Sequence, residues 1–467
     1  MKRKIRILYV SAEVSPYANA GGLGEVGRSF PEALKESGEF EVRRVMPCYR
    51  QISQKLKYLA DYPVFMEAGC ETCVLKTDPE NKDIITYFIG NDRYFCRDNI
   101  YAYEDDGFRF FFFCRAVAEM LRILGFKPDI VHTNDWHTGF LPLLLKKEYP
   151  SIKTVYTIHN ISYHGFIPAS CLQDMLSEKE RERLGYPKWL DFMKAGILYA
   201  DLLTTVSPGY RREILKTGHT CDTARLLKEK SASFIGILNG IDTGSYSPEN
   251  DGVLAYPYNK NHPVRKKINR SFLRSKLGLT DSDVPLIAMI TRLVYDKGLD
   301  LLIKAISSAD LSTFQLIVMG AGNPYYQGIF EEIAAEYPKS VIFEKEYSSE
   351  QAKRIYAAAD FYLMPSLSEP CGLGQLYAMR YGAVPIVNPV GGLKDTVKYD
   401  ESHPSGMSGY YMEAWTGEAL AKALKWAVKT YHSPEWEGLV RNGMKYDASW
   451  SKSVNRYLKH YKALLSK

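Results

Sequence analysis

The stretch FYLMPSLSEPCGLGQLYAMRYGAVPIV, residues 361–387, decides the fold. Its pattern predicts a buried strand, a loop, a helix and a second buried strand. We expect Gly372 and Gly374 to open the helix and Gly382 to end it. Because the first turn of a helix has unpaired backbone N–H groups and a positive dipole end, it can hold a phosphate. Glu369 lies just ahead of this turn, where a carboxylate accepts hydrogen bonds from a sugar diol.

The same alternation of apolar runs and helical segments continues on both sides of this stretch. Further buried strands are expected at 5–10, 41–46, 129–132, 153–158, 202–206, 234–238, 285–290, 314–319, 341–343 and 383–387. Strands that alternate with helices are typical of parallel α/β sheets, so we predict two doubly wound, Rossmann-like domains facing a cleft. A polar stretch, 243–269, is the predicted linker. The expected domains are 1–248 and 249–440, with C-terminal helices at 441–467 crossing back to the first domain.

Composition excludes several classes of protein. A formal net charge of +6 is slight for 467 residues, which argues against a nucleic-acid surface. The eight cysteines are scattered, which in a chain of this length predicts reduced thiols and a cytoplasmic protein. A plastid location would require a transit peptide that has been removed. The longest aromatic run, Phe108 to Phe113, contains Arg109 and is too short to span a bilayer. We therefore expect neither a nucleic-acid nor a membrane partner, and the sequence does not report the oligomeric state.

A glycine-rich loop follows the first predicted strand. Residues 22–27, GLGEVG, match the dinucleotide-binding pattern GxGxxG. In that fold the first glycine follows the strand almost at once, whereas about ten residues intervene here. We expect instead that Gly21 and Gly22 approach a ligand at the mouth of the sheet. A loop that merely needs positive φ is the alternative.

Three imidazoles and a carboxylate follow two other predicted strands. They are His132, Asp135, His137 and His159. Such groups are typical zinc ligands, but no cysteine joins them and they are spread over two loops, so we expect no metal. Histidines satisfied within the core are an open alternative. We favour polar groups that line a sugar pocket, because neutral imidazole and carboxylate groups pair well with hydroxyls.

Two cations share the loop after the strand 285–290. Arg292 supplies a planar fork and Lys297 a point charge, a pair suited to clamping a diphosphate and to stabilising charge on it as it leaves. Both belong to the same strand-end side as Glu369. Two solvated surface cations are the alternative interpretation.

Taken in order, these motifs resemble those of the bacterial glycogen synthases and plant starch synthases, retaining glucosyltransferases of the two-Rossmann GT-B type. The resemblance covers nearly the whole chain. Its most specific segments are 135–137 (DWH), 157–160 (TIHN), 194–197 (KAGI), 205–208 (TVSP), 239–242 (NGID), 369–373 (EPCGL), 375–378 (QLYA) and 391–393 (GGL).

The resemblance implies transfer of α-glucose, with retention, from a nucleotide-glucose, with ADP-glucose favoured, to the non-reducing 4-OH of an α-1,4-glucan. It implies catalytic roles for Glu369, Arg292, Lys297 and His159. The implied donor-binding positions are Gly21, Gly22, Asp135, Asn239, Tyr347, Cys371, Gly372, Leu373, Gly374 and Gln375. Neither a cofactor nor a metal is expected, because the two cations would take a metal's place at the diphosphate.

Four positions depart from the family pattern. Asn19 and Ala20 stand where the family usually has Lys and Thr, Glu25 replaces the usual Asp, and Gly374 replaces the usual Thr. All four belong to the implied donor and acceptor pocket, so two alternatives stay open. One is a related transferase that uses UDP-glucose or a non-glucan acceptor. The other is a non-catalytic protein that binds glucan or nucleotide.

Overall fold

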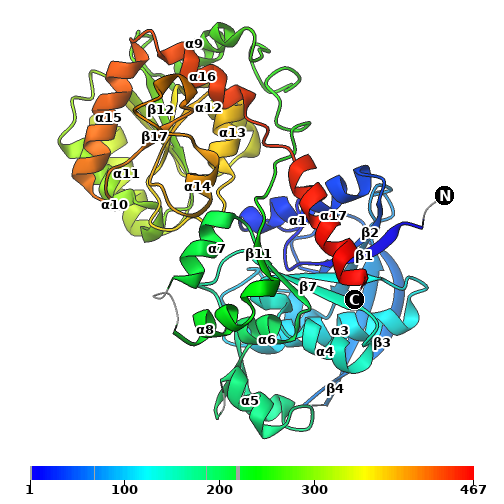
Figure 1. Cartoon of the computed structure of the whole chain (residues 1–467). Coiled ribbons are helices and arrows are strands. Elements are labelled where there is room, and N and C mark those ends of the chain that lie inside the picture. Colours follow the sequence, from blue (N-terminus) through cyan, green and yellow to red (C-terminus); the bar gives the residue numbers. More distant parts are fainter. Residues whose placement is uncertain (1–2, 68, 186, 217–220, 467) are drawn as a thin grey trace. The chain divides into compact units, whose positions relative to one another are not determined.

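The computed structural model describes residues 3–67, 69–185, 187–216 and 221–466 (Figure 1). The chain divides into two compact units. Unit 1 comprises residues 1–240 and 450–467, and unit 2 comprises 241–449. Both are α/β units built on a mainly parallel sheet, which confirms the predicted fold class. No helix in the described part of the chain is long and apolar enough to cross a membrane.

Unit 1 contains a nine-stranded sheet in the order β11-β10-β7-β6-β1-β2-β5-β4-β3. Its strands are β1 (Ile5–Val10), β2 (Phe40–Pro47), β3 (Lys57–Met66), β4 (Gly69–Thr77), β5 (Thr86–Gly90), β6 (Ile130–Asn134), β7 (Lys153–Ile158), β10 (Leu202–Thr205) and β11 (Phe234–Gly236). A separate ribbon pairs β8 (Phe166–Pro168) with β9 (Trp189–Asp191). The helices are α1 (Gly22–Glu36), α2 (Asp92–Phe95), α3 (Asp106–Ile123), α4 (Leu141–Glu148), α5 (Glu178–Leu184), α6 (Phe192–Tyr199), α7 (Pro208–Leu215), α8 (Cys221–Glu229) and α17 (Ser451–Leu465).

Unit 2 contains a six-stranded parallel sheet in the order β14-β13-β12-β15-β16-β17. Its strands are β12 (Leu286–Ile290), β13 (Gln315–Met319), β14 (Val341–Glu344), β15 (Phe361–Met364), β16 (Val384–Val387) and β17 (Tyr410–Tyr411). The helices are α9 (Lys266–Leu277), α10 (Leu299–Ser307), α11 (Pro324–Glu336), α12 (Ser349–Ala358), α13 (Gly374–Arg380), α14 (Gly391–Thr396), α15 (Gly417–Tyr431) and α16 (Trp436–Lys445).

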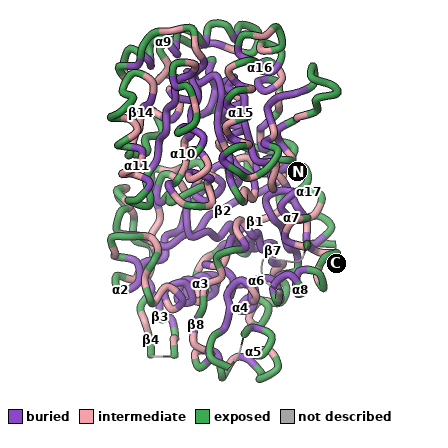
Figure 2. Tube along the Cα trace, turned by 90° about the vertical axis from the view of Figure 1, so that its left-hand side faces the viewer, coloured by how far each residue is buried: buried purple, intermediate pink, exposed green. Residues whose placement is uncertain are grey.

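The burial of the central strands follows from the packing of helices against the sheets. The central strands β1 and β12 are almost wholly buried because helices cover both faces of a parallel sheet. Figure 2 traces most of β1 and β2 in purple, whereas much of the trace near the label of β4 is green or pink. Apolar runs with no polar alternation therefore form the core strands of both units.

One edge of the unit 1 sheet contains antiparallel strands that the sequence analysis did not predict. β3 pairs antiparallel with β4, and β4 antiparallel with β5.

Two cysteines of β4, Cys70 and Cys73, have the C-x-x-C spacing. Side chains three apart on a strand point to opposite faces, and here Cys70 is exposed while Cys73 is buried. The spacing therefore does not bring the two thiols together.

The predicted linker, 243–269, is instead part of unit 2. Tyr246 and Tyr258 are buried in its core, and the Tyr258 hydroxyl donates to the carbonyl of Tyr381 at 2.7 Å. Helix α9 already begins at Lys266. Buried aromatic side chains thus fix a segment whose polar composition predicted a linker.

The limits of the two units differ from the predicted domain boundaries at 248 and 440. Ile241 pairs with Ser449, and its N–H donates to the carbonyl of Ala448 at 2.8 Å, so both ends of unit 2 are joined at one place. Helix α17 belongs to unit 1 and lies beside α1 (Figure 1). The Trp450 indole N–H donates to the Ser29 hydroxyl at 2.9 Å.

Each sheet has a switch point, where strand order reverses and connections leave in opposite directions. In unit 1 it lies between β1 and β6, and in unit 2 between β12 and β15. Ligands of doubly wound sheets bind outside the carboxyl ends of the strands at such points. The loops after these four strands are therefore the places to look for a site.

Candidate active site

The structure brings Lys297 and Glu369 together at the switch point of unit 2. Lys297 Nζ donates to Glu369 Oε2 at 2.8 Å, and the two side chains are 14% and 12% exposed. The Ser366 hydroxyl donates to the same oxygen at 3.2 Å. An ion pair this little exposed is screened weakly by water. It therefore holds the two strand-end loops in a defined relation.

Backbone contacts fix the same two loops. Gly298 has a φ of +75°, and a Cβ there would lie 2.3 Å from the Pro365 carbonyl oxygen, so only glycine allows this approach. The Leu367 N–H donates to the carbonyl of Asp296 at 2.8 Å. The Gly392 N–H donates to the carbonyl of Glu369 at 3.0 Å, which ties the acidic residue to the start of α14.

The other predicted polar groups of unit 2 are more open. Arg292 is exposed, two residues beyond the end of β12. Tyr347 is 59% exposed and follows β14, two strands away from β12 in the sheet. The structure thus joins Lys297 to Glu369 directly, whereas Arg292 and Tyr347 lie on loops of the same unit with their side chains exposed to solvent.

The side chain of Gln375 holds the loop of Cys371, Gly372 and Leu373 from its buried side. Gly372 has a φ of +72°, and helix α13 begins two residues later than predicted, at Gly374. Gln375 is fully buried, and its amide N–H groups donate to the carbonyls of Cys371 and Gly372 at 3.0 Å each. Gln375 thus shapes the loop, and its side chain is not accessible to solvent.

The structure shows why glycine stands at position 374, where the family pattern has threonine. A Cβ at Gly374 would lie 2.7 Å from the Tyr362 hydroxyl oxygen, well inside van der Waals contact. Tyr362 is buried and donates to the carbonyl of Ile290 at 2.9 Å. The Tyr362 ring therefore fills the space that a side chain at position 374 would need.

Asp135 is the centre of the polar cluster in unit 1. It has a φ of +55°, rare for a residue other than glycine, which costs about 1–3 kcal/mol. Its carboxylate accepts from the backbone N–H groups of His159 at 2.7 Å and Asn160 at 3.2 Å. Burial raises the pKa of Asp135 to about 7, although these N–H groups oppose the shift. Near neutral pH the carboxyl group can therefore either donate or accept a hydrogen bond.

The three histidines do not share one role. His159 Nε2 lies 2.9 Å from the Asn134 amide oxygen, and burial lowers the pKa of His159 to about 3, so its ring is neutral. His132 is enclosed in the core between the hydroxyls of Tyr461 and Thr157, at 2.6 Å each. For His132 the pocket interpretation was wrong, because all its ring nitrogens have partners within the core.

The remaining predicted groups of unit 1 lie near the ends of its strands and helices. His137 is buried and stacks on Trp136, with ring centroids 4.1 Å apart. Asn239 is buried, three residues after β11 at one edge of the sheet. Gly21 and Gly22 are exposed at the start of α1. The structure therefore assembles Asp135 with His159, but places Asn239 beyond an edge strand.

Glu13 is a residue of the candidate site that the sequence analysis did not identify. It is buried just after β1, where its carboxylate accepts from the Ala20 N–H and from the Tyr101 hydroxyl, both at 2.7 Å. It thereby anchors the glycine loop. In the same loop the Asn19 amide donates to the Glu25 carboxylate at 3.2 Å, so two of the departing residues are partners. The available signal was a carboxylate three residues after a buried strand, in the segment that leads to the glycines.

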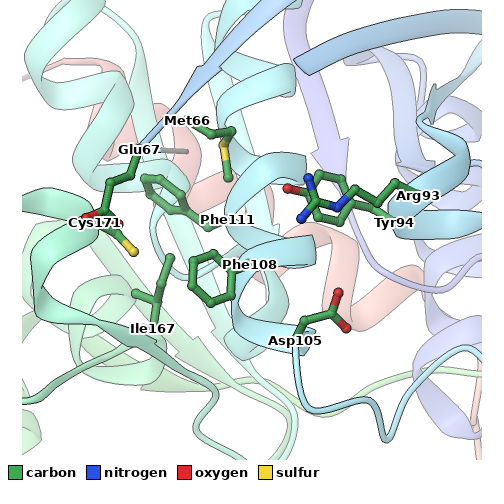
Figure 3. Close-up of a pocket in the computed structure, with 9 residues that line it drawn as sticks. All are labelled: Met66, Glu67, Arg93, Tyr94, Asp105, Phe108, Phe111, Ile167 and Cys171. Atoms are coloured by element: carbon green, nitrogen blue, oxygen red, sulfur yellow. The ribbon is translucent and has the colours of Figure 1, made fainter. Parts of the chain in front are cut away.

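A pocket of about 300 Å³ in unit 1 contains none of the predicted residues (Figure 3). It is lined by Met66, Glu67, Arg93, Tyr94, Asp105, Phe108, Phe111, Ile167 and Cys171. The side chains of Phe108, Phe111 and Ile167 make much of it apolar. Its cation, Arg93, is paired with Glu71 at 2.7 Å. The switch-point loops offer the better chemistry for a phosphorylated sugar.

Two family models show which class of protein these two α/β units form. Residues 6–229 match the starch synthase catalytic domain, and residues 271–443 match glycosyl transferases group 1. A glycogen synthase of Moorella thermoacetica is 41% identical over all of this chain and 98% of its own length. One of Clostridium botulinum is 38% identical over 98% of this chain and 99% of its own. The chain belongs to the glycogen synthase family and is a glucosyltransferase.

Solved structures agree with this assignment. The catalytic domain of starch synthase IV from Arabidopsis thaliana, bound to ADP and acarbose, matches with a TM-score of 0.93 and 30% identity over the full length of both chains. A sucrose-phosphate synthase from Thermosynechococcus elongatus matches with a TM-score of 0.67 at 18% identity, which shows a shared fold alone.

Proposed function

We propose that this protein transfers α-glucose, with retention, from ADP-glucose to the non-reducing 4-OH of an α-1,4-glucan. The observation that carries the proposal is the Lys297–Glu369 ion pair at a switch point, in a chain of the glycogen synthase family. The ADP bound to a similar starch synthase supports an adenine nucleotide. The seven cysteines whose surroundings are described form no disulfide, which supports a cytoplasmic location.

The proposed roles follow from charge and hydrogen-bonding capacity. Lys297 and Arg292 stabilise the diphosphate as its bond to the sugar C1 breaks. Glu369 accepts hydrogen bonds from the sugar hydroxyls, and neutral His159 contacts the sugar near its reacting face. The acceptor oxygen bonds to C1 on the face from which the diphosphate leaves, and the acceptor's proton passes to the departing phosphate oxygen. This front-face route requires positioning and charge stabilisation rather than a protein nucleophile.

Removing either member of the ion pair tests the proposal. With ADP-glucose and glycogen as substrates, we expect Lys297→Ala and Glu369→Ala each to lower kcat by roughly a hundredfold or more, the scale of a lost transition-state contact. Released ADP and chain extension are the measurements. Lys345→Ala, which removes an exposed cation paired with Glu331 at 3.4 Å, is the matched control and should keep the wild-type rate. Wild-type rates in both site variants would place the chemistry elsewhere.

A second candidate differs only in the donor. The uncharged Asn19 amide bonds to Glu25 where the family usually carries a lysine, and this favours testing UDP-glucose beside ADP-glucose. A donor panel at equal concentration, compared by kcat/KM, decides between the two. Faster transfer from UDP-glucose would replace the ADP-glucose assignment and leave the glucan acceptor in place.

A further inference from the structure

The β8–β9 ribbon of unit 1 presents an aromatic face that the proposed chemistry does not use. Its register places Phe166 opposite Asp191, Ile167 opposite Leu190, and Pro168 opposite Trp189. In an antiparallel pair, opposite residues and alternate residues share a face. Both aliphatic residues are fully buried. The other face therefore carries two aromatic rings, a proline and an aspartate.

Both aromatic side chains are large and exposed to solvent. Phe166 is 53% exposed and Trp189 is 52% exposed. Tyr163, shortly before the ribbon, is 54% exposed. Phe166 and Trp189 are diagonal neighbours, so their backbones lie roughly 7–8 Å apart. Single exposed apolar residues need no explanation, but neighbouring ones rimmed by polar groups mark binding surfaces.

Polar contacts hold the ribbon in place. His164 Nδ1 lies 2.6 Å from the Asp191 carboxylate, and its ring stacks parallel to Phe166 at 6.1 Å. Asp191 also caps α6 by accepting from the Lys194 N–H at 3.1 Å. The Phe192 N–H donates to the Gly165 carbonyl at 3.1 Å. The aromatic face is thus attached to a helix rather than to a free loop.

The segment that leads into the ribbon packs against Trp136, the residue next to Asp135. Gly165 has a φ of +64°, and a Cβ there would lie 1.9 Å from a ring carbon of Trp136. Trp136 directly follows Asp135 in the chain, and Tyr163 lies four residues after His159. A ligand chain that reaches Asp135 and His159 therefore has an adjoining aromatic surface within the same unit.

We infer that the β8–β9 aromatic face binds a segment of the α-glucan acceptor remote from its reacting end. The inference rests on the proposed function, which makes the acceptor a polymer with more sugar units than one reaction needs. Each glucose unit has a face of C–H bonds and a rim of hydroxyls. Aromatic rings match the C–H face, and the exposed Tyr163 shortly before the ribbon carries a hydroxyl group that matches the sugar hydroxyls, while the buried Asp191 carboxylate and the His164 imidazole hold the ribbon in place.

Direct binding measurements test the inference without relying on turnover. We expect Phe166→Ala and Trp189→Ala each to raise the Kd for maltoheptaose and for glycogen roughly tenfold, the order of effect of removing an aromatic stacking surface. Trp189→Phe should restore most of the affinity and Trp189→Leu little, because stacking requires a ring. Phe65→Ala, at a phenylalanine 63% exposed on β3 of the same unit, is the matched control and should leave the Kd unchanged.

The outcomes separate this inference from the proposed function. If wild-type protein transfers glucose to glycogen and the Phe166 and Trp189 variants bind glucan as the Phe65 control does, the inference is wrong and the function stands. If the wild type shows neither transfer to glucan nor glucan binding, the proposed function itself fails. If the variants keep their glucan affinity but convert a dimer to a monomer in light scattering, the face is a subunit interface and the inference is overturned.

Discussion

At the scale of single residues, the ion pair between Lys297 and Glu369 has structural as well as chemical consequences. Each charge is largely removed from water and is offset by the other. Removing one partner of a buried pair costs about 3–5 kcal/mol, and Asp296, whose carboxylate lies 3.9 Å from Lys297 Nζ, offsets part of this cost when Glu369 is removed. Glu369→Gln keeps a group that can accept from Ser366, so comparing its thermal stability and its rate with those of Glu369→Ala separates loss of fold from loss of chemistry.

Gly374 lies too close to the Tyr362 side chain to leave room for a larger residue. Because Tyr362 occupies the space beside Gly374, we expect Gly374→Thr to destabilise the protein by about 1–3 kcal/mol through overpacking. Adding Tyr362→Phe removes the nearest atom, the hydroxyl oxygen, and should recover part of that loss. Urea unfolding measures both. Gly328→Thr is the control, since a Cβ at that helical position meets nothing within 4 Å. Equal midpoints for the two Gly→Thr variants would contradict the argument.

At the scale of secondary structure, buried strands were predictable where apolar runs met polar stops. The predicted ranges 5–10 and 153–158 coincide with β1 and β7. The β3 strand was not predicted, because only Tyr62 and Val64 of its ten residues are buried and it contains Pro63. A proline is tolerated on an edge strand, where no ladder hydrogen bond is lost. Edge position is a property of the whole sheet, and local sequence does not report it.

The candidate site was likewise predictable in some residues and not in others. Lys297 and Glu369 were predictable as groups on one side of a sheet, because parallel strands bring their carboxyl ends to the same edge. The inward role of Gln375 was not predictable, since it depends on the path of the loop that its amide holds. The anchoring role of Glu13 depends likewise on Tyr101, a partner 88 residues away.

A buried lysine at the start of helix α9 makes the stability of the protein depend on pH. Lys266, at its start, is buried and donates to the carbonyls of Tyr356 at 2.7 Å and Tyr381 at 2.9 Å. Burial lowers the pKa of Lys266 to about 7, from 10.5 for an ordinary lysine. Between these values the unfolded chain binds more protons than the folded one, so stability rises with pH.

We therefore expect wild-type stability to increase from pH 7 to pH 10 relative to Lys266→Met, by up to about 1.4 kcal/mol per pH unit. Urea unfolding of both proteins at pH 7, 8.5 and 10 measures this difference. Lys339→Met, which removes an exposed lysine, provides the control for a general change in charge. A constant difference between wild type and Lys266→Met would show that Lys266 keeps an ordinary pKa in the folded protein.

At the scale of the whole molecule, unit 2 is an insertion in unit 1. The two ends of unit 2 meet where Ile241 pairs with Ser449, and neighbouring strands lie about 4.8 Å apart. Insertions whose ends lie close together disturb the host domain little. The last helix then completes the core of unit 1. The ring of Phe30 lies 5.0 Å from Trp450 and 4.6 Å from Tyr457.

This arrangement predicts how fragments of the chain behave. Residues 1–240 alone lose the aromatic cover of Phe30 and the Tyr461 partner of His132, and each large core side chain lost costs about 3–5 kcal/mol. That loss rivals the whole stability of a typical domain, so we expect no cooperative thermal transition from this fragment. Joining residue 240 to residue 450 through a short Gly-Ser linker should restore the transition, and residues 241–449 should show one of their own. Differential scanning calorimetry of the three fragments is the measurement. A cooperative transition in 1–240 alone would mean that α17 covers unit 1 without being required for its core.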